Sequence, residues 1–373
     1  MRFLHTSDWQ LGLARYWFDA DAQARFAGDR FEAVKRLGEV AREEGAELVV
    51  VAGDVFESNR VDGRTLRRGL DAMAAVGVPV FLLPGNHDAF DAASVYRSRA
   101  FAAARPANVR VLDSTAPVAV RPGVEVVGAP WPSKRPTADL VAALAAGLEP
   151  APGVLRIAVA HGAVDALSPH SAEPSRVALA GAEAALAEGR FHYLALGDRH
   201  SATRVADRIW YAGSPEVTDF GEERPGRVLL VDLTADGCRV EERETGRWSF
   251  LPLAAELTSD ADVAALAARL EAVADKPRTA LRLELTGGLP LHARARLDEL
   301  VAGCAERFAT VQEWGPGPLL LPDAVDRDSL ELGGFAEAAF VGLLAEARGE
   351  GPGAAVARDA LALLYRLAAE GPG

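Results

Sequence analysis

Short apolar runs alternate with amphipathic stretches through residues 1–250 of the chain. Apolar runs of this kind are typical of strands in a largely buried sheet, and the stretches between them are typical of helices that cover it. The predicted strands are residues 2–6, 47–52, 79–83, 124–129, 155–160 and 193–196. Helices are predicted at residues 31–44, capped by Asp29, and at 63–75, capped by Asp62. The pattern predicts an α/β fold built as an α+β sandwich.

The pattern of apolar positions changes after Pro252. The elements expected there are a helix at 259–273, a strand at 279–285, a helix at 292–307 and a strand at 308–313. They predict a small α+β cap, followed by C-terminal helices. We therefore divide the chain into a core of residues 1–250, a cap of residues 251–322 and a C-terminal helical segment of residues 323–373.

The last predicted helix has four apolar residues on roughly one face, namely Val356, Leu361, Leu364 and Leu367. This face can pack on the helix's own cap. It can equally serve as a partner-binding surface. The sequence leaves both interpretations open.

The composition argues against a membrane-spanning, secreted or disulfide-rich protein. Of the 373 residues, 49% are hydrophobic and 25% are charged, and no apolar run is long enough to span a bilayer. The N-terminus lacks the hydrophobic region of a signal peptide, so we expect a soluble cytoplasmic protein with no membrane contact. Cys238 and Cys304 share no short-range motif, which makes a disulfide framework or a thiolate metal site unexpected. With a net charge of -13, any contact with nucleic acid must come from a local basic surface.

Acids, amides and histidines gather where predicted strands end. The five clusters are Asp8 with Gln10, Gly53-Asp54, Gly85-Asn86-His87-Asp88, His161-Gly162, and Gly197-Asp198-Arg199-His200. In layered α/β folds ligands bind at the carboxyl ends of the strands, so residues far apart in sequence can meet there. Packing alone does not explain isolated polar residues after apolar strands. The clusters therefore predict a shared site.

The order of these clusters resembles the calcineurin-like metallophosphoesterase superfamily. The opening run from Arg2 to Gly12 resembles that of the SbcD-type DNA repair exonucleases, as do Gly53-Asp54-Val55-Phe56 and Tyr211-Ala212-Gly213-Ser214-Pro215. The resemblance covers about the first 230 residues with specific motifs. It implies a four-layer metallophosphoesterase core with a smaller α+β cap domain and C-terminal helices.

The resemblance also implies two divalent metal ions bridged by Asp54. The implied ligands are Asp8, Gln10, Asp54 and His200 for one ion, and Asp54, Asn86, His161 and Asp198 for the other. Such a pair of ions would activate water and neutralise the charge of a phosphodiester. His87 would protonate the leaving oxygen, with Asp88 as its orienting partner.

Two ligands depart from the family pattern. Gln10 stands where the family has His, and Asp198 stands where the family has the first His of His-x-His. An amide oxygen is a weaker ligand than imidazole, whereas a carboxylate adds negative charge. We therefore expect one weakened and one strengthened site, with Mn²⁺ as the first choice and Mg²⁺, Fe or Zn²⁺ as alternatives.

Three functions remain open from the sequence. The leading hypothesis is a metal-dependent DNA nuclease in double-strand-break repair or end processing, for which the resemblance implies DNA, a homodimer and an SbcC-type SMC-like ATPase as partners. The second is a phosphodiesterase or nucleotidase for small substrates on the same core. The third is a DNA-end-binding subunit with a weakened metal site.

Overall fold

The computed structural model describes residues 1–168, 173–320, 334–347, 349 and 351–369. The chain divides into two compact units. Unit 1 comprises Met1–Tyr16 and Gln23–Trp248, and unit 2 comprises Trp17–Ala22 and Ser249–Gly373. The predicted border between 322 and 323 lies outside the described residues.

The first sheet of unit 1 has the strand order β12-β11-β1-β2-β3-β4. Its strands are β1 (Arg2–Thr6), β2 (Val49–Val51), β3 (Val80–Leu82), β4 (Val109–Val111), β11 (Arg227–Leu233) and β12 (Cys238–Glu244). Strands β1 to β4 are parallel, whereas β11 and β12 are antiparallel to their neighbours. The four parallel strands therefore send their carboxyl ends to one edge of the sheet.

The second sheet of unit 1 has the order β5-β6-β7-β8-β10-β9. Its strands are β5 (Val118–Arg121), β6 (Val124–Gly128), β7 (Leu155–His161), β8 (Tyr193–Gly197), β9 (Thr203–Ala206) and β10 (Ile209–Tyr211). Strands β6, β7, β8 and β10 are parallel. Their register pairs His161 with Gly197, so the ends of β7 and β8 lie side by side.

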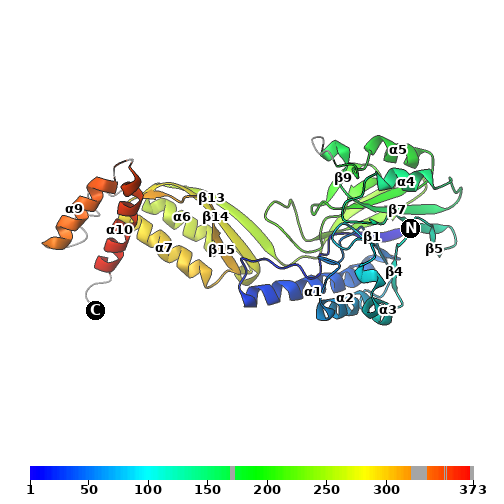
Figure 1. Ribbon diagram of the computed structural model, residues 1–373, viewed down its shortest axis with the longest axis horizontal. Helices are drawn as coiled ribbons and strands as arrows, with labels where there is room; N and C mark the ends of the chain where they lie inside the picture. The colour runs from blue at the N-terminus through cyan, green and yellow to red at the C-terminus, as the bar shows by residue number, and fades with distance from the viewer. Residues whose placement is uncertain (169–172, 321–333, 348, 350, 370–373) are drawn as a thin grey trace. The chain divides into compact units, whose positions relative to one another are not determined.

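Helices cover the outer faces of the two sheets (Figure 1). Those of the first sheet are α1 (Ala20–Glu44), α2 (Gly63–Ala74) and α3 (Arg99–Ala104), and those of the second are α4 (Leu140–Ala146) and α5 (Leu179–Ala187). Two short 3-10 helices, η1 (Val95–Arg97) and η2 (Asp165–Leu167), lie in connecting loops. Between the sheets lies an apolar core that includes Phe3, Val50 and Leu229. These four layers confirm the predicted α/β class.

Helix α1 begins earlier than the sequence pattern indicates. It starts at Ala20, where a carboxylate oxygen of Asp19 accepts a hydrogen bond from the backbone N–H of Ala22 at 2.7 Å. Asp29 lies inside the helix and is buried, and its carboxylate accepts a hydrogen bond from the indole of Trp248 at 3.0 Å. The prediction that Asp29 caps this helix is therefore wrong. By contrast, Asp62 caps α2 as predicted, since it accepts bonds from Arg64 and Thr65.

Unit 2 contains a mainly parallel sheet packed against helices. Its elements are β13 (Ser249–Leu257), α6 (Asp260–Glu271), η3 (Lys276–Arg278), β14 (Thr279–Leu289), α7 (Leu291–Ala305), β15 (Thr310–Glu313) and β16 (Leu319–Leu320). Strand β14 pairs in parallel with β13, β15 and β16. An apolar core joins α6 and α7 to this sheet through residues such as Leu266, Leu283 and Leu297. In this unit helices alternate along the chain with strands whose described pairings are all parallel.

The short segment Trp17–Ala22 belongs to unit 2, although it lies far from the rest of that unit in sequence. The rings of Trp17 and Phe18 lie 5.3 Å and 6.1 Å from the ring of Phe250 in β13. Aromatic pairs at these distances are favourable contacts. The segment therefore adds aromatic cover to the sheet of unit 2, which the sequence division at residue 250 does not anticipate.

The C-terminal helices are α9 (Phe335–Ala347) and α10 (Pro352–Ala369), and they pack on each other. In α10, Leu361 is fully buried in a cluster with Phe340 of α9 and Leu291 of α7. Val356 and Leu367 are exposed instead. The apolar face predicted for this helix is thus divided between packing within unit 2 and exposure to solvent.

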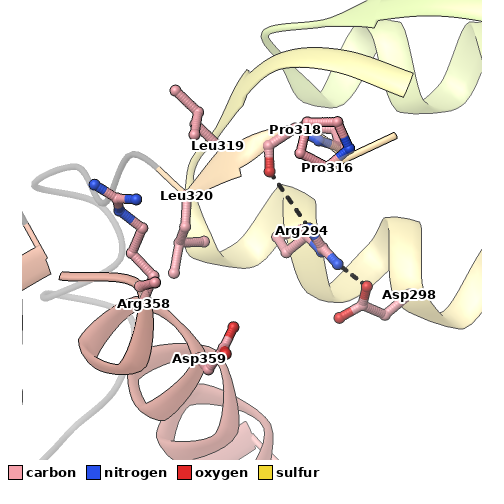
Figure 2. A pocket seen from close by; sticks show the side chains of 9 residues that line it. Arg294, Asp298, Pro316, Pro318, Leu319, Leu320, Arg358 and Asp359 are labelled. Atoms are coloured by element: carbon pink, nitrogen blue, oxygen red, sulfur yellow. Dashed lines mark hydrogen bonds and ion pairs between the residues drawn. The ribbon is translucent and has the colours of Figure 1, made fainter. Parts of the chain in front are cut away.

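A pocket of about 480 Å³ lies within unit 2 (Figure 2). It is bounded by α7, the loop before β16 and α10. Arg294 and Asp298 form an ion pair at 2.8 Å in its wall, and Arg358 and Asp359 face it from α10. Its lining includes none of the predicted metal ligands.

Among the described residues, no helix is long and apolar enough to cross a membrane. Both cysteines are free thiols, as the sequence indicates.

Candidate metal centre

The loops at the carboxyl ends of five strands converge in unit 1. Asp8 and Asp54 follow β1 and β2 of the first sheet, whereas His161 ends β7 of the second. One ligand atom from each of these three buried residues lies within 4.8 Å of the other two. Of the other predicted ligands, Gln10 also follows β1, Asn86 follows β3, and Asp198 and His200 follow β8. Convergence that the sequence could only suggest is thus present in the fold.

Asp54 lies at the centre of the cluster. Its Oδ1 accepts a hydrogen bond from the backbone N–H of His87 at 2.9 Å. Its Oδ2 lies 3.5 Å from Nε2 of His161 and 4.0 Å from Nε2 of His87. A carboxylate in this position can share its oxygens between two cations.

One half of the site is built around His161. Its Nε2 lies 2.7 Å from Oδ1 of Asn86 and 3.8 Å from a carboxylate oxygen of Asp198. Its Nδ1 lies 2.8 Å from the backbone carbonyl of Ala52. Because a carbonyl only accepts, Nδ1 carries a proton, and the other ring nitrogen faces the oxygens of Asn86, Asp54 and Asp198. This is the orientation of a metal-binding histidine.

The other half is built around Asp8, Gln10 and His200. Nε2 of His200 lies 3.7 Å from a carboxylate oxygen of Asp8 and 3.4 Å from the side-chain amide of Gln10. The backbone N–H of Asp198 donates to both carboxylate oxygens of Asp8 at 3.2 Å. The structure therefore brings together all seven predicted ligands: Asp8, Gln10, Asp54, Asn86, His161, Asp198 and His200.

Two residues behind His200 are not predicted from the sequence. Nδ1 of His200 lies 2.5 Å from the hydroxyl of Thr218 and 3.1 Å from a carboxylate oxygen of Glu222. Neither residue belongs to a motif or to a predicted strand end, so no pattern in the sequence singles them out. Only the fold reveals their role.

The pKa values of the clustered carboxylates and of His161 show that positive charge is favoured at this site. Burial raises the pKa of Asp54 to about 7, an effect opposed by His161 and reinforced by Asp8. Burial would lower the pKa of His161, but the carboxylates of Asp54, Asp8 and Asp198 raise it to about 9. Burial also raises the pKa of Asp198. In the absence of a metal ion, protons on these groups offset the clustered negative charge, as a divalent cation would when bound. The oxygen and imidazole donors are of the types that bind such an ion.

Backbone strain is concentrated at the site. Among the described residues, six that are not glycine have a positive φ, and four of these are the candidate ligands Asp8, Gln10, Asp54 and Asp198. A positive φ is sterically unfavourable for residues other than glycine, and strained backbone of this kind is found most often at functional sites. The loops therefore hold the ligands in conformations that local preference alone does not favour.

Gly53 shows how tightly the loops pack. Its φ is +96°, and a Cβ placed there would lie 2.2 Å from Nδ1 of His161. Only glycine lets the Asp54 loop approach the imidazole this closely. A physical requirement thus underlies the Gly-Asp pattern.

Neighbouring side chains support the loop that carries Asp8 and Gln10. The buried guanidinium of Arg30 donates to the backbone carbonyl of Trp9 at 2.6 Å and to that of Val217 at 3.0 Å. The hydroxyl of Ser214 donates to the carbonyl of Asp8 at 2.8 Å. The first ligand loop is therefore tied to the segment that leads to Glu222.

His87 lies beside Asp54, and 31% of its side chain is exposed. Its Nδ1 lies 2.9 Å from the backbone carbonyl of Glu57. Asp88 instead accepts hydrogen bonds from the backbone of Phe56 and Gly85 and from the hydroxyl of Tyr96. The predicted pairing of Asp88 with His87 is therefore wrong: Asp88 is fully buried and holds the loops together, while Glu57 orients the ring.

Comparison with known proteins agrees with this geometry. Residues 1–175 match the calcineurin-like phosphoesterase family. The chain carries a calcineurin-like phosphoesterase domain. Its fold is that of the calcineurin-like metallophosphoesterases, as the sequence resemblance implies. The matched range includes Asp8, Asp54, Asn86 and His161, whereas His200 follows it.

Two curated relatives match part of the chain. The DNA double-strand break repair protein Mre11 of Archaeoglobus fulgidus is 34% identical over 91 residues, which are 24% of this chain and 19% of that protein. A subunit of the nuclease SbcCD from Rhodobacter capsulatus is 33% identical over 94 residues, 24% of this chain and 22% of that protein. The chain thus spans about a fifth of the length of the curated relatives that it matches.

Among solved structures, the crystal structure of TT1561 of Thermus thermophilus has a TM-score of 0.42 and 13% sequence identity. The similarity covers 65% of this chain and 98% of TT1561.

Proposed function

We propose that the phosphoesterase domain is a divalent-metal-dependent nuclease that hydrolyses DNA phosphodiesters in double-strand-break repair or end processing. The convergence of Asp8, Asp54 and His161 carries the proposal, because it supplies a buried anionic cluster suited to divalent cations. The two curated relatives, named for break repair and for a nuclease, support DNA as the substrate.

Each group of residues has a proposed task. Asp8, Gln10, Asp54 and His200 would hold one divalent ion, and Asp54, Asn86, His161 and Asp198 would hold a second. When bound, such ions supply Lewis-acid activation of water and of the phosphate ester. The mixed oxygen and imidazole set favours Mn²⁺, with Mg²⁺, Fe or Zn²⁺ as alternatives. Equilibrium dialysis against each metal, followed by elemental analysis, measures this preference.

His87 is the proposed general acid. The carbonyl of Glu57 fixes its Nδ1, so its Nε2 side remains available at the exposed edge of the site. From there the ring can give a proton to the leaving oxygen of the broken phosphodiester. Proton transfer by a positioned side chain contributes about 10²–10⁴-fold to rate.

The test is hydrolysis of linear double-stranded DNA, single-stranded DNA and bis(p-nitrophenyl) phosphate with Mn²⁺. Wild type should cleave DNA, and His87→Ala should lose about 10²–10⁴-fold in rate while its Mn²⁺ content stays unchanged. His292→Ala is the matched control, because this histidine lies in unit 2 and pairs with Asp260. It should cleave DNA like wild type.

Other results would point to the two alternative functions. Turnover of the small ester without DNA cleavage would identify a phosphodiesterase or nucleotidase for small substrates. DNA binding without turnover of any substrate would identify a DNA-end-binding subunit. Either outcome contradicts the proposed nuclease.

We further propose that the protein works as a homodimer with an SbcC-type ATPase partner. One of the curated relatives is itself named as a subunit of a nuclease. Exposed apolar side chains on α9 and α10, including Phe335, Val356 and Leu367, support a docking role for the C-terminal helices. Light scattering on the purified chain, alone and mixed with such an ATPase, measures both associations.

A further inference from the structure

The imidazole of His200 has two distinct sides. Its Nε2 faces Asp8 and Gln10, while its Nδ1 faces Thr218 and Glu222. We propose that Glu222 is a positioning residue that acts with Thr218 to hold His200 in the Nδ1–H form. It thereby sets the affinity of the Asp8, Gln10 and His200 half for a divalent cation. This inference rests on the proposed function and deepens it.

The carboxylate of Glu222 is buried and accepts several hydrogen bonds. Only 6% of its side chain is exposed. One carboxylate oxygen accepts from the backbone N–H of Thr218 at 3.0 Å, and the other accepts from that of Asp219 at 3.1 Å. The hydroxyl of Thr218 also donates to this carboxylate. Several donors thus converge on one buried acid, whose two oxygens both act as acceptors.

These contacts decide which nitrogen of His200 carries the proton. The hydroxyl of Thr218 has a single hydrogen, and that hydrogen is given to Glu222. Toward His200 the hydroxyl can therefore only accept, at 2.5 Å from Nδ1. The carboxylate oxygen, at 3.1 Å, can likewise only accept. Nδ1 must donate, so in the neutral ring the lone pair lies on Nε2, toward Asp8 and Gln10.

The two imidazole ligands obtain the same orientation from different sources. Nδ1 of His161 is held by the backbone carbonyl of Ala52, which no side-chain substitution removes. Nδ1 of His200 depends on the side chains of Thr218 and Glu222. Since Gln10 offers only a neutral amide, His200 is the one imidazole among the predicted ligands of its half. The orientation of that ring therefore bears directly on cation binding.

Glu223 provides a matched control. It follows Glu222 in the chain, its side chain is exposed, and its backbone N–H donates to the hydroxyl of Ser201 at 2.9 Å. Glu223→Gln removes the same charge as Glu222→Gln from nearly the same place and leaves that backbone contact unchanged. Any difference between the two variants therefore reports the contacts of Glu222 rather than net charge.

Calorimetric titration of the full chain with Mn²⁺ is the first test. Glu222→Gln should weaken binding by about 10–100-fold for one of the bound ions, as removal of a partner behind a metal-binding histidine typically does. Glu223→Gln should bind like wild type. Equal binding by Glu222→Gln and wild type would overturn the proposal. A wild type that binds Mn²⁺ but cleaves no phosphodiester would remove the proposed function and leave this inference standing.

The second test measures which ring nitrogen of His200 carries the proton. Nitrogen-15 spectra of histidine-labelled, metal-free protein distinguish the two neutral forms, and His200→Gln identifies the signal. At a pH at which this ring is neutral, wild type should show the Nδ1–H form and Glu222→Gln a mixture. A merely structural role for Glu222 would leave the form unchanged and so refute the proposal. If Glu222→Gln does not fold, Thr218→Val removes the bridging hydroxyl and faces the same two measurements.

Discussion

The two halves of the candidate metal centre share Asp54 but are held in place differently. His161 ends a strand, and its ring is oriented by a backbone carbonyl. His200 lies in a loop after β8, and its ring is oriented by the side chains of Thr218 and Glu222. The first arrangement depends on a backbone carbonyl just after β2 of the facing sheet, whereas the second depends on particular side chains. An imidazole ligand is therefore oriented by a backbone group in one half and by side chains in the other.

Replacing the shared carboxylate should break both halves at once and have the largest effect. Asp54→Asn keeps the shape of the side chain but removes its charge. We expect a loss of cation affinity greater than the roughly 100-fold typical of residues behind a ligand. Metal per chain, measured by elemental analysis after dialysis against Mn²⁺, checks this.

Asp62→Asn is the control for that experiment, because Asp62 caps α2 at the surface and Asn caps a helix about as well. It should keep the wild-type metal content. An Asp54→Asn protein with as much Mn²⁺ as wild type would contradict the assignment of both halves.

The pH dependence of the stability of the fold should show that protons and divalent cations compete for the same side chains in the two halves. In the metal-free protein the pKa of Asp54 is raised to about 7, and those of His161 and His200 are raised to about 9. For His200, burial lowers the pKa, while the hydrogen bond to Glu222 raises it. A raised pKa stabilises the fold at low pH, and this contribution is lost as pH rises through the folded value. The metal-free protein should therefore lose stability as pH rises from about 4 to about 9, through Asp54 up to about pH 7 and through the two histidines up to about pH 9.

Bound Mn²⁺ replaces these protons, so the increase in Tm that it causes should be larger at pH 9 than at pH 6. Thermal unfolding with and without Mn²⁺ at both pH values gives the comparison. His161→Gln and His200→Gln, taken separately, apportion the effect between the halves. An increase in Tm that is equal at both pH values would show that the clustered charges are not linked to cation binding.

Restoring an imidazole at position 10 should make the two halves more alike, with the smallest effect. Gln10→His replaces an amide by a stronger ligand for Zn²⁺, so the ratio of Zn²⁺ to Mn²⁺ affinity should rise, by about tenfold if the gain is near 1.4 kcal/mol. Competition titrations with both metals measure this ratio. An unchanged ratio would mean that position 10 does not contact the cation.

Much of the fold could be predicted from the sequence because buried strands and amphipathic helices leave local patterns. The strand predicted at residues 2–6 agrees with β1 at both ends, and the cap of Asp62 on α2 is confirmed. The start of α1 could not be predicted in the same way, because Asp19 is an equally ordinary capping residue and Asp29 accepts its hydrogen bond from the distant Trp248. Local propensity does not distinguish a cap from an acid that is buried by tertiary contacts.

The strand-end clusters could be predicted because each places polar residues at the end of an apolar run, and the resemblance to the family implied which of them are ligands. Asp88 satisfies the same pattern, yet its carboxylate is used by the backbone of Phe56 and Gly85 and by Tyr96. Position in the sequence cannot show which of two adjacent polar side chains points into the site and which supports the loop behind it.

The sequence by itself determined the layered α/β class, the order of the strand-end clusters and the residue types that can bind a cation. The tertiary structure alone decided which atoms meet: Glu57 behind His87, and Thr218 with Glu222 behind His200. The physical reason is range. Apolar periodicity and turn chemistry act between near neighbours in the chain and so are visible in the sequence. The hydrogen bonds that orient an imidazole depend on distances of a few ångströms between segments that only the packed sheets bring together.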